Sequence, residues 1–207
     1  MALVGLLAGC GRTQAEETFG ITAIDSVPFS QPQSADLVII PVDVFILDEQ
    51  TGTFSSERTA DEVQTILAEA NQIWSEAGIW FKTTTIKRGN IPFETVAHQI
   101  RHEFDPFFSK LHKTDRRFQS ADPVQIFFVQ TVRGPNGVAV HSHAAVFIAD
   151  ETQNAPGRTL AHELGHLLSL GDIANSPRKL MHSGGNGTEL TSVEIDLARK
   201  SGENLIK

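Results

Sequence analysis

Two histidines and a glutamate lie close together in the run from Thr159 to Asp172. His162 and His166 are four residues apart, so in a helix they share one face, one turn above the other. Both imidazoles can then reach a single metal ion about 2 Å from each nitrogen. Glu163 lies beside that face, where its carboxylate meets a water at the metal instead of the metal itself. The spacing predicts a metal-dependent hydrolase with Glu163 as its general base.

The residues around this motif predict a helix with two different faces. Its leucines cluster on the side opposite the histidines, so the helix buries them and turns the imidazoles toward a cleft. These leucines are Leu160, Leu164, Leu167 and Leu168. The helix is expected to begin between Pro156 and Arg158.

A catalytic zinc site needs a third protein ligand and one coordination position left open. The chain has a single cysteine, Cys10, so a metal must be held by His, Asp or Glu side chains. Four downstream residues are candidates for the third ligand. They are Asp172, His182, Glu189 and Glu194. The spacing alone leaves all four open.

Residues 36 to 200 resemble the metzincin family of zinc peptidases. The family signature continues from the second histidine through a glycine to a third ligand, and then to a turn that contains methionine. Asp172 stands at the third-ligand position, where bacterial members similar to snapalysin carry Asp. Leu180-Met181-His182 matches the methionine turn, and the segment Ala70 to Ile79 is similar to the first long helix and following strand of the family.

This resemblance implies a Zn²⁺ ion held by His162, His166 and Asp172, with Met181 beneath it. It also implies that Glu163 takes a proton from water and returns it to the leaving amine of a peptide. We therefore expect a metalloendopeptidase that acts on a peptide or protein substrate. Two alternatives are a zinc hydrolase of another amide, such as peptidoglycan, and a non-catalytic lipoprotein that keeps the fold.

The sequence departs from the family pattern at two positions. The glycine after the second histidine falls on Ser169, where positive φ is unfavourable for serine, so Gly171 is expected to make the turn. Some metzincins place a Tyr just after the methionine turn to support the transition state. This chain has no Tyr and carries Ser183 there, so the bound metal is expected to be the main stabiliser of the oxyanion.

Two further pairs of histidines lie close together in the sequence. His141 and His143 are two apart in a predicted strand, so both are expected on one side, at the rim of the cleft. His98 and His102 are four apart in a predicted helix, on the face opposite its apolar residues. We expect that second pair to face solvent.

The alternation of predicted elements indicates an α+β fold, a metzincin-like mixed twisted sheet packed by helices. The active-site helix is followed by the methionine turn and a C-terminal helix. Strands are predicted at 37–47, 79–86, 124–129 and within 138–150. One helix is predicted after the capping pair Thr59 and Glu62, and another from about Phe93, which Pro106 bends or ends. The last helix is predicted after the capping pair Thr191 and Glu194, and it ends at about Arg199.

The N-terminal residues predict export and lipidation. Residues 1–10 form a short apolar run, and Leu7-Ala8-Gly9-Cys10 resembles the processing box of bacterial lipoproteins. Cys10 would then carry lipid and anchor the protein to a membrane of the bacterial cell envelope. Residues 11–35 predict a flexible tether and residues 36–207 the peptidase domain.

Composition excludes one class of partner. Lys and Arg total 17 against 25 acidic residues, which gives a net charge of -8. A nucleic-acid-binding protein needs a basic face for phosphates, so we expect no nucleic acid partner. We also expect a monomer of one domain, since 207 residues fit a single core.

Overall fold

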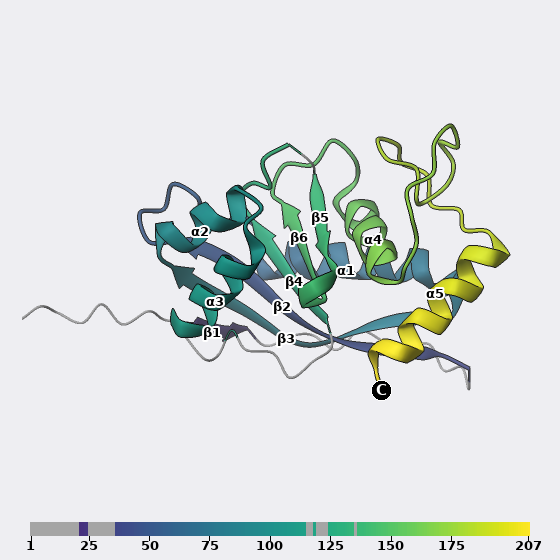
Figure 1. The fold of residues 1–207 in the computed structure, drawn as a ribbon, viewed down its shortest axis with the longest axis horizontal. Coiled ribbons are helices and arrows are strands. Elements are labelled where there is room, and N and C mark those ends of the chain that lie inside the picture. Colours follow the sequence, from purple (N-terminus) through teal and green to yellow (C-terminus); the bar gives the residue numbers. More distant parts are fainter. Residues whose placement is uncertain (1–20, 25–35, 115–117, 119–123, 135) are drawn as a thin grey trace, which may run out of the picture.

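The computed structural model describes residues 21–24, 36–114, 118, 124–134 and 136–207. The predicted signal segment and Cys10 lie outside these residues. Within them, six strands form one sheet in the order β1-β3-β2-β4-β6-β5 (Figure 1). The strands are β1 (Ile21–Ile24), β2 (Val38–Glu49), β3 (Ile79–Ile91), β4 (Val124–Val129), β5 (Gly137–Val140) and β6 (Ala145–Ala149).

The sheet is mixed, as the sequence predicted. Strands β3, β2, β4 and β6 run parallel, and β1 and β5 pair antiparallel at the two edges. Strand β1 lies within residues 11–35, the segment predicted to be a tether, and pairs with β3. Pro41 precedes the part of β2 that pairs with β4, which begins at Val42, so strand β2 is paired only with β3 at Pro41.

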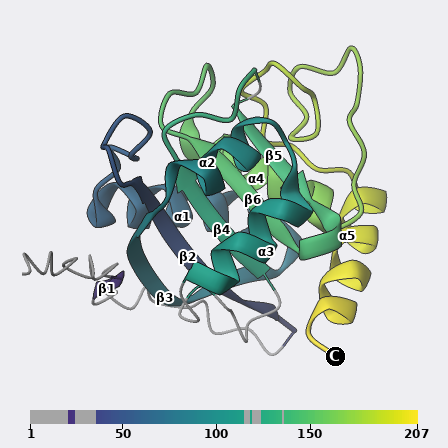
Figure 2. The same ribbon diagram turned by 60° about the vertical axis from the view of Figure 1, so that its left-hand side comes forward.

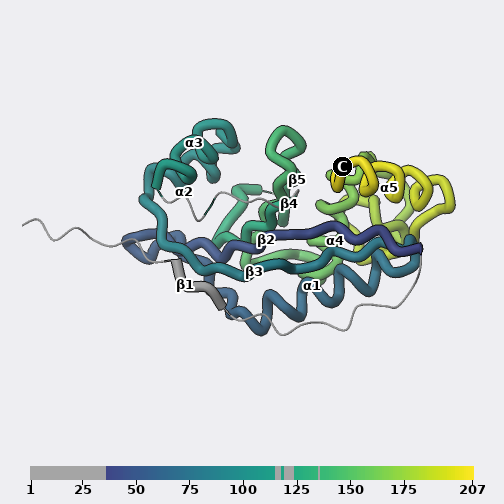
Figure 3. Tube along the Cα trace, turned by 90° about the horizontal axis from the view of Figure 1, so that it is seen from below, coloured from purple at the N-terminus to yellow at the C-terminus, as the bar shows by residue number. Residues whose placement is uncertain are grey.

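Helices cover both faces of the sheet. On one face α1 (Ala60–Trp74), α4 (Pro156–Leu167) and α5 (Ser192–Leu205) bury their apolar residues against β2 and its neighbours. On the other face α2 (Phe93–Ile100) and α3 (Phe104–Thr114) pack on a cluster rich in phenylalanine. Figure 2 shows α2 and α3 lying across β4 and β6, and Figure 3 shows α1 on the opposite side of the sheet. Coverage of both faces explains why β2 is apolar almost throughout.

The predicted capping residues begin their helices as expected. Thr59 and Glu62 form a reciprocal capping box at the start of α1, and Thr191 and Glu194 form one at the start of α5. Helix α5 continues to Leu205, past the predicted end at Arg199.

The helix predicted from Phe93 is two helices, which corrects the sequence analysis. Helix α2 ends at Ile100, and His102 adopts a positive φ of 60° before α3 begins. Pro106 lies in the first turn of α3, where a missing N–H costs no helical hydrogen bond. His98 and His102 therefore do not lie on one helix face, and His98 Nδ1 contacts the Glu103 carboxylate at 2.5 Å.

The end of α4 is closed by Ser169 itself, not by Gly171 as expected. Ser169 has a φ of 68°, and its N–H donates to the His166 carbonyl at 2.8 Å. The N–H of Leu170 donates to the Gly165 carbonyl at 2.9 Å. This pair of bonds is the Schellman motif, in which the left-handed position is usually glycine. The tight turn directs the chain back toward the histidines.

Replacing Ser169 by glycine is expected to raise the free energy of unfolding by about 0.5–1 kcal/mol, because glycine adopts positive φ without a Cβ clash. Urea unfolding monitored by circular dichroism measures the change. The control is Ser201→Ala, which removes the 3.1 Å contact between the Ser201 and Ser169 hydroxyls and leaves the backbone alone. A loss of stability in Ser169→Gly equal to that of the control would contradict backbone strain at this position.

Candidate metal centre

Helix α4 presents its motif to a cleft because its other face is fixed in the core. Leu160, Ala161 and Leu164 are fully buried. The indole N–H of Trp74 on α1 donates to the Ala161 carbonyl at 3.1 Å, which joins the two helices. The opposite face of α4 lines a cleft of about 460 Å³ with its two histidines and Glu163.

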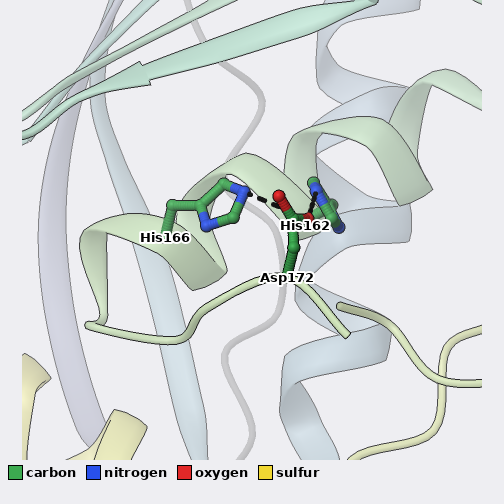
Figure 4. A group of neighbouring side chains, drawn as sticks. All are labelled: His162, His166 and Asp172. Atoms are coloured by element: carbon green, nitrogen blue, oxygen red, sulfur yellow. Dashed lines mark ion pairs between the residues drawn. The ribbon is translucent and has the colours of Figure 1, made fainter. Parts of the chain in front are cut away.

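The structure brings His162, His166 and Asp172 together (Figure 4). Asp172 Oδ1 lies 3.3 Å from His162 Nε2 and 3.8 Å from His166 Nε2. One candidate ligand atom from each residue lies within 4.8 Å of the other two. Ligand atoms bound about 2 Å from a tetrahedral zinc ion are roughly 3.3 Å apart, so the arrangement fits such an ion with little movement.

Backbone carbonyls orient both imidazoles. The Nδ1 of His162 lies 2.9 Å from the Leu180 carbonyl oxygen, and the Nδ1 of His166 lies 2.9 Å from that of Leu170. A carbonyl only accepts, so each Nδ1 carries the proton and each Nε2 keeps its lone pair for a ligand role. Burial lowers the pKa of His162, which favours the neutral, metal-binding form.

Glu163 is a buried carboxyl whose pKa is raised to about 7, first by burial and second by the negative charge of Asp172. A backbone hydrogen bond from Ala139 on β5 and the positive charge of Arg158 act in the opposite direction. A group with a pKa near neutrality exchanges a proton readily with water and with a leaving amine.

The other proposed third ligands are occupied elsewhere. His182 Nδ1 lies 3.0 Å from the Ile173 carbonyl oxygen, and Glu189 pairs with Lys179 at 3.6 Å. Glu194 caps α5. In the described part of the chain, His162, His166 and Asp172 are the only group of three side chains placed to share a metal.

His141 and His143 do not share one side of a strand, which corrects the sequence analysis. Residues His141–His143 form a 3₁₀ turn between β5 and β6. His141 lines the cleft, with its Nε2 2.8 Å from the His166 carbonyl oxygen. His143 instead stacks on Phe108 of α3, with ring centroids 4.1 Å apart, so it is absent from the cleft rim.

Met181 is fully buried against α4. A Cβ added at Gly165 would stand 2.5 Å from the Met181 sulfur, so only glycine lets the two segments approach this closely. Ser183, which stands where some metzincins carry a Tyr, lines the cleft. The role of Met181 beneath a metal stays a prediction.

Two cleft residues escaped the sequence analysis. Arg158 is buried in the first turn of α4. The helix dipole disfavours a cation at a helix N-terminus, so an arginine at this position of the sequence is a signal of a specific role. Gly137 begins β5, and glycine in a strand often marks a close approach of another group. A Cβ there would stand 2.8 Å from Glu163 Cγ and 3.1 Å from the Phe147 carbonyl oxygen.

Gly137→Ala is expected to lower catalytic turnover by about tenfold, because the added methyl group displaces Glu163 from its position. Zinc content should stay unchanged, since the three atoms nearest to this Cβ belong to Glu163, Ile148 and Phe147 and not to a candidate ligand. Steady-state kinetics with metal analysis of the same sample tests this. Gly134→Ala is the control, because a Cβ at Gly134 meets nothing within 4 Å, although its φ of 107° strains the backbone. Equal losses in both variants would contradict a steric effect on Glu163.

The fold of this chain is similar to that of a solved protein, archaemetzincin. The crystal structure of archaemetzincin from Methanopyrus kandleri is similar over 80% of this chain and 97% of that chain, with a TM-score of 0.52 and 13% sequence identity. A zinc-dependent peptidase from Methanocorpusculum labreanum (strain Z) aligns over 80% of this chain and all of that chain, at 12% identity and with a TM-score of 0.39.

Neither a family model nor a curated protein matches the sequence. The likeness to archaemetzincin is therefore one of fold, and the chemistry must be argued from the residues of this chain.

Proposed function

We propose that this protein is a zinc-dependent peptidase. The observation that carries the proposal is the convergence of His162 Nε2, His166 Nε2 and Asp172 Oδ1, with Glu163 beside them in the same cleft. Two imidazoles and one carboxylate form the ligand set of catalytic zinc sites that keep one position open. A zinc ion bound there would supply a Lewis acid that polarises a carbonyl and makes water more acidic.

Each side chain of the site has a distinct task in this proposal. The three ligand residues hold the ion, and the Leu180 and Leu170 carbonyls keep the imidazoles in the required tautomer. Glu163 accepts a proton from water and delivers it to the departing amine. Its raised pKa, at about 7, suits both transfers near neutral pH.

The cleft also suggests how a substrate lies. Strand β5 pairs with β6 along one edge, and Gly137, Val138 and Ala139 of β5 line the cleft. We propose that an extended peptide lies along β5, since a strand edge offers N–H and C=O groups at regular spacing. This geometry favours a peptide over a compact amide substrate.

The test combines metal analysis with peptide cleavage on the purified protein. We expect one zinc per chain, cleavage of a denatured protein substrate, loss of cleavage with a chelator and recovery with Zn²⁺. The variant His162→Ala/His166→Ala should lose both zinc and cleavage. Zinc binding without cleavage of any peptide would sink the peptidase proposal and favour another amide substrate or a binding role.

Asp172→Asn is expected to weaken zinc binding by about 100-fold, because a neutral amide replaces an anionic ligand. Competition with a chromophoric chelator measures the affinity. Asp196→Asn, an exposed site on α5, is the matched control and should bind zinc like the unaltered protein. Unchanged affinity in Asp172→Asn would remove Asp172 from the ligand set.

We also propose that lipid on Cys10 holds the protein in the bacterial cell envelope. The support is the Leu7-Ala8-Gly9-Cys10 sequence. Among the described residues, no helix is long and apolar enough to cross a bilayer. Fractionation of cells that express the protein and its Cys10→Ser variant tests this, and membrane retention of the variant would refute it.

A further inference from the structure

Arg158 is a buried arginine at the edge of the metal centre, with 4% of its surface exposed. Its Nη2 donates to the Leu180 carbonyl at 2.6 Å and to the His182 carbonyl at 2.5 Å. Its Nε donates to the Gly187 carbonyl at 3.2 Å. One guanidinium thus ties the first turn of α4 to three points of the loop that follows the predicted ligands.

This placement is unfavourable for the arginine itself. Burial lowers the pKa of Arg158, and the negative charges of Glu163 and Asp172 act in the opposite direction. The N-terminal end of α4 also repels a positive charge. No carboxylate of the described residues forms an ion pair with it, so backbone carbonyls are its direct partners. The attraction of the Glu163 and Asp172 carboxylates offsets only part of the cost of burying the cation, because the pKa of Arg158 remains lowered, and a well-packed apolar side chain would avoid that cost. The arrangement therefore indicates a task beyond packing.

The task is visible at the Leu180 carbonyl. This oxygen accepts from Arg158 Nη2 and from His162 Nδ1, which lies 2.9 Å away. The guanidinium also holds the carbonyl of His182, on the other side of Met181. The carbonyls of Leu180 and His182, on both sides of the buried Met181, are therefore held by one side chain. The Leu180 carbonyl in turn orients the imidazole ring of His162, a candidate metal ligand.

We propose that Arg158 is a positioning residue of the zinc site, which holds the Leu180 carbonyl so that His162 presents Nε2 to the metal. This inference rests on the proposed zinc site. The planar guanidinium reaches several carbonyls at fixed angles, which the single ammonium of lysine does not reproduce. Groups that orient metal ligands through a hydrogen bond typically change metal affinity by about 10–100-fold.

The chain offers a matched control in Arg199 of α5. Its Nη1 donates to the carbonyls of Ala77 and Gly78, and its Nη2 to that of Asp36, at 3.0–3.1 Å. Unlike Arg158, it also pairs with a carboxylate, that of Asp36, at 3.1 Å. Arg199 thus makes three similar bonds to backbone carbonyls, but from a helix that contributes none of the ligands. Substitution of Arg199 therefore measures the general effect, on folding and zinc affinity, of losing an arginine that is bonded to several backbone carbonyls.

The experiment compares Arg158→Lys and Arg158→Met with Arg199→Lys and Arg199→Met. Zinc affinity is measured by chelator competition, and folding by circular dichroism. We expect both Arg158 variants to bind zinc about 10–100-fold more weakly, and both Arg199 variants to bind like the unaltered protein. The lysine variant keeps the charge, so it provides the comparison if the methionine variant does not fold.

A second readout needs no metal. Nitrogen NMR of the imidazoles in metal-free protein reports which ring nitrogen of His162 carries the proton. We expect the Nδ1–H form in the unaltered protein and a mixture of tautomers in Arg158→Lys. Unchanged affinity and an unchanged spectrum in both Arg158 variants would overturn the inference. If the unaltered protein binds no zinc, the proposed function fails, and the spectrum alone decides the role of Arg158.

Discussion

Glu163→Gln is expected to lower the rate of peptide cleavage by about 10²–10⁴-fold and to leave zinc bound. The amide keeps the shape of the side chain and still accepts a hydrogen bond from the Ala139 N–H, but it cannot take a proton from water. Single-turnover kinetics and metal analysis on one preparation measure both properties. Glu189→Gln, at a carboxylate paired with Lys179, should retain both.

The outcome separates three roles for Glu163. Loss of zinc together with activity would make Glu163 a ligand. The geometry argues against that role, because Glu163 is not part of the group formed by His162, His166 and Asp172. Retention of full activity would mean that another group accepts the proton. Only zinc without turnover agrees with a general base.

The same substitution is expected to stabilise the metal-free protein at high pH, by about 3 kcal/mol at pH 8. The pKa of Glu163 is about 7 in the folded protein against an ordinary value of 4.5. Below pH 4.5 the carboxyl is protonated in both states and costs nothing. Between pH 4.5 and 7 the unfolded chain releases its proton first, so the stability of the unaltered protein falls as pH rises.

Urea unfolding in the presence of a chelator, at pH 4.5 and pH 8, tests this. The gain in Glu163→Gln should be near zero at the lower pH and largest at the higher one. Glu203→Gln, at an exposed residue of α5, measures the effect of the same change on the surface. An equal gain at both pH values would show that burial does not raise the pKa of Glu163.

The local chemistry of the site was predictable because it lies in one short stretch of sequence. Histidines four apart share a helix face in any protein, so His162, His166 and the adjacent Glu163 followed from spacing. The third candidate ligand did not follow from spacing, since four residues qualified. The resemblance to the metzincins singled out Asp172, and the path of the loop brings Asp172 to the imidazoles.

The errors came from backbone conformations that composition does not reveal. Serine is unfavourable at positive φ, yet Ser169 adopts it because two hydrogen bonds close the helix there. The split between α2 and α3 depends on His102, another residue with positive φ. His143 was misplaced because a 3₁₀ turn, which has no period of two, replaces the expected strand.

Arg158 shows a different limit. Its partners are carbonyl oxygens of Leu180, His182 and Gly187, and every residue has such an oxygen, so no sequence pattern marks them. Side-chain chemistry can be read from sequence, whereas contacts to the main chain require the fold.

All three candidate ligands lie on α4 and the short loop after it, and this has a consequence for the order of assembly. Closing so small a loop costs little chain entropy. If the site binds zinc as proposed, we expect a nascent chain to capture the ion once that helix forms. The Leu170 carbonyl that orients His166 belongs to the same stretch, but the Leu180 carbonyl that orients His162 arrives with the later loop. Capture of the ion would thus begin locally and tighten when the rest of the domain closes around it.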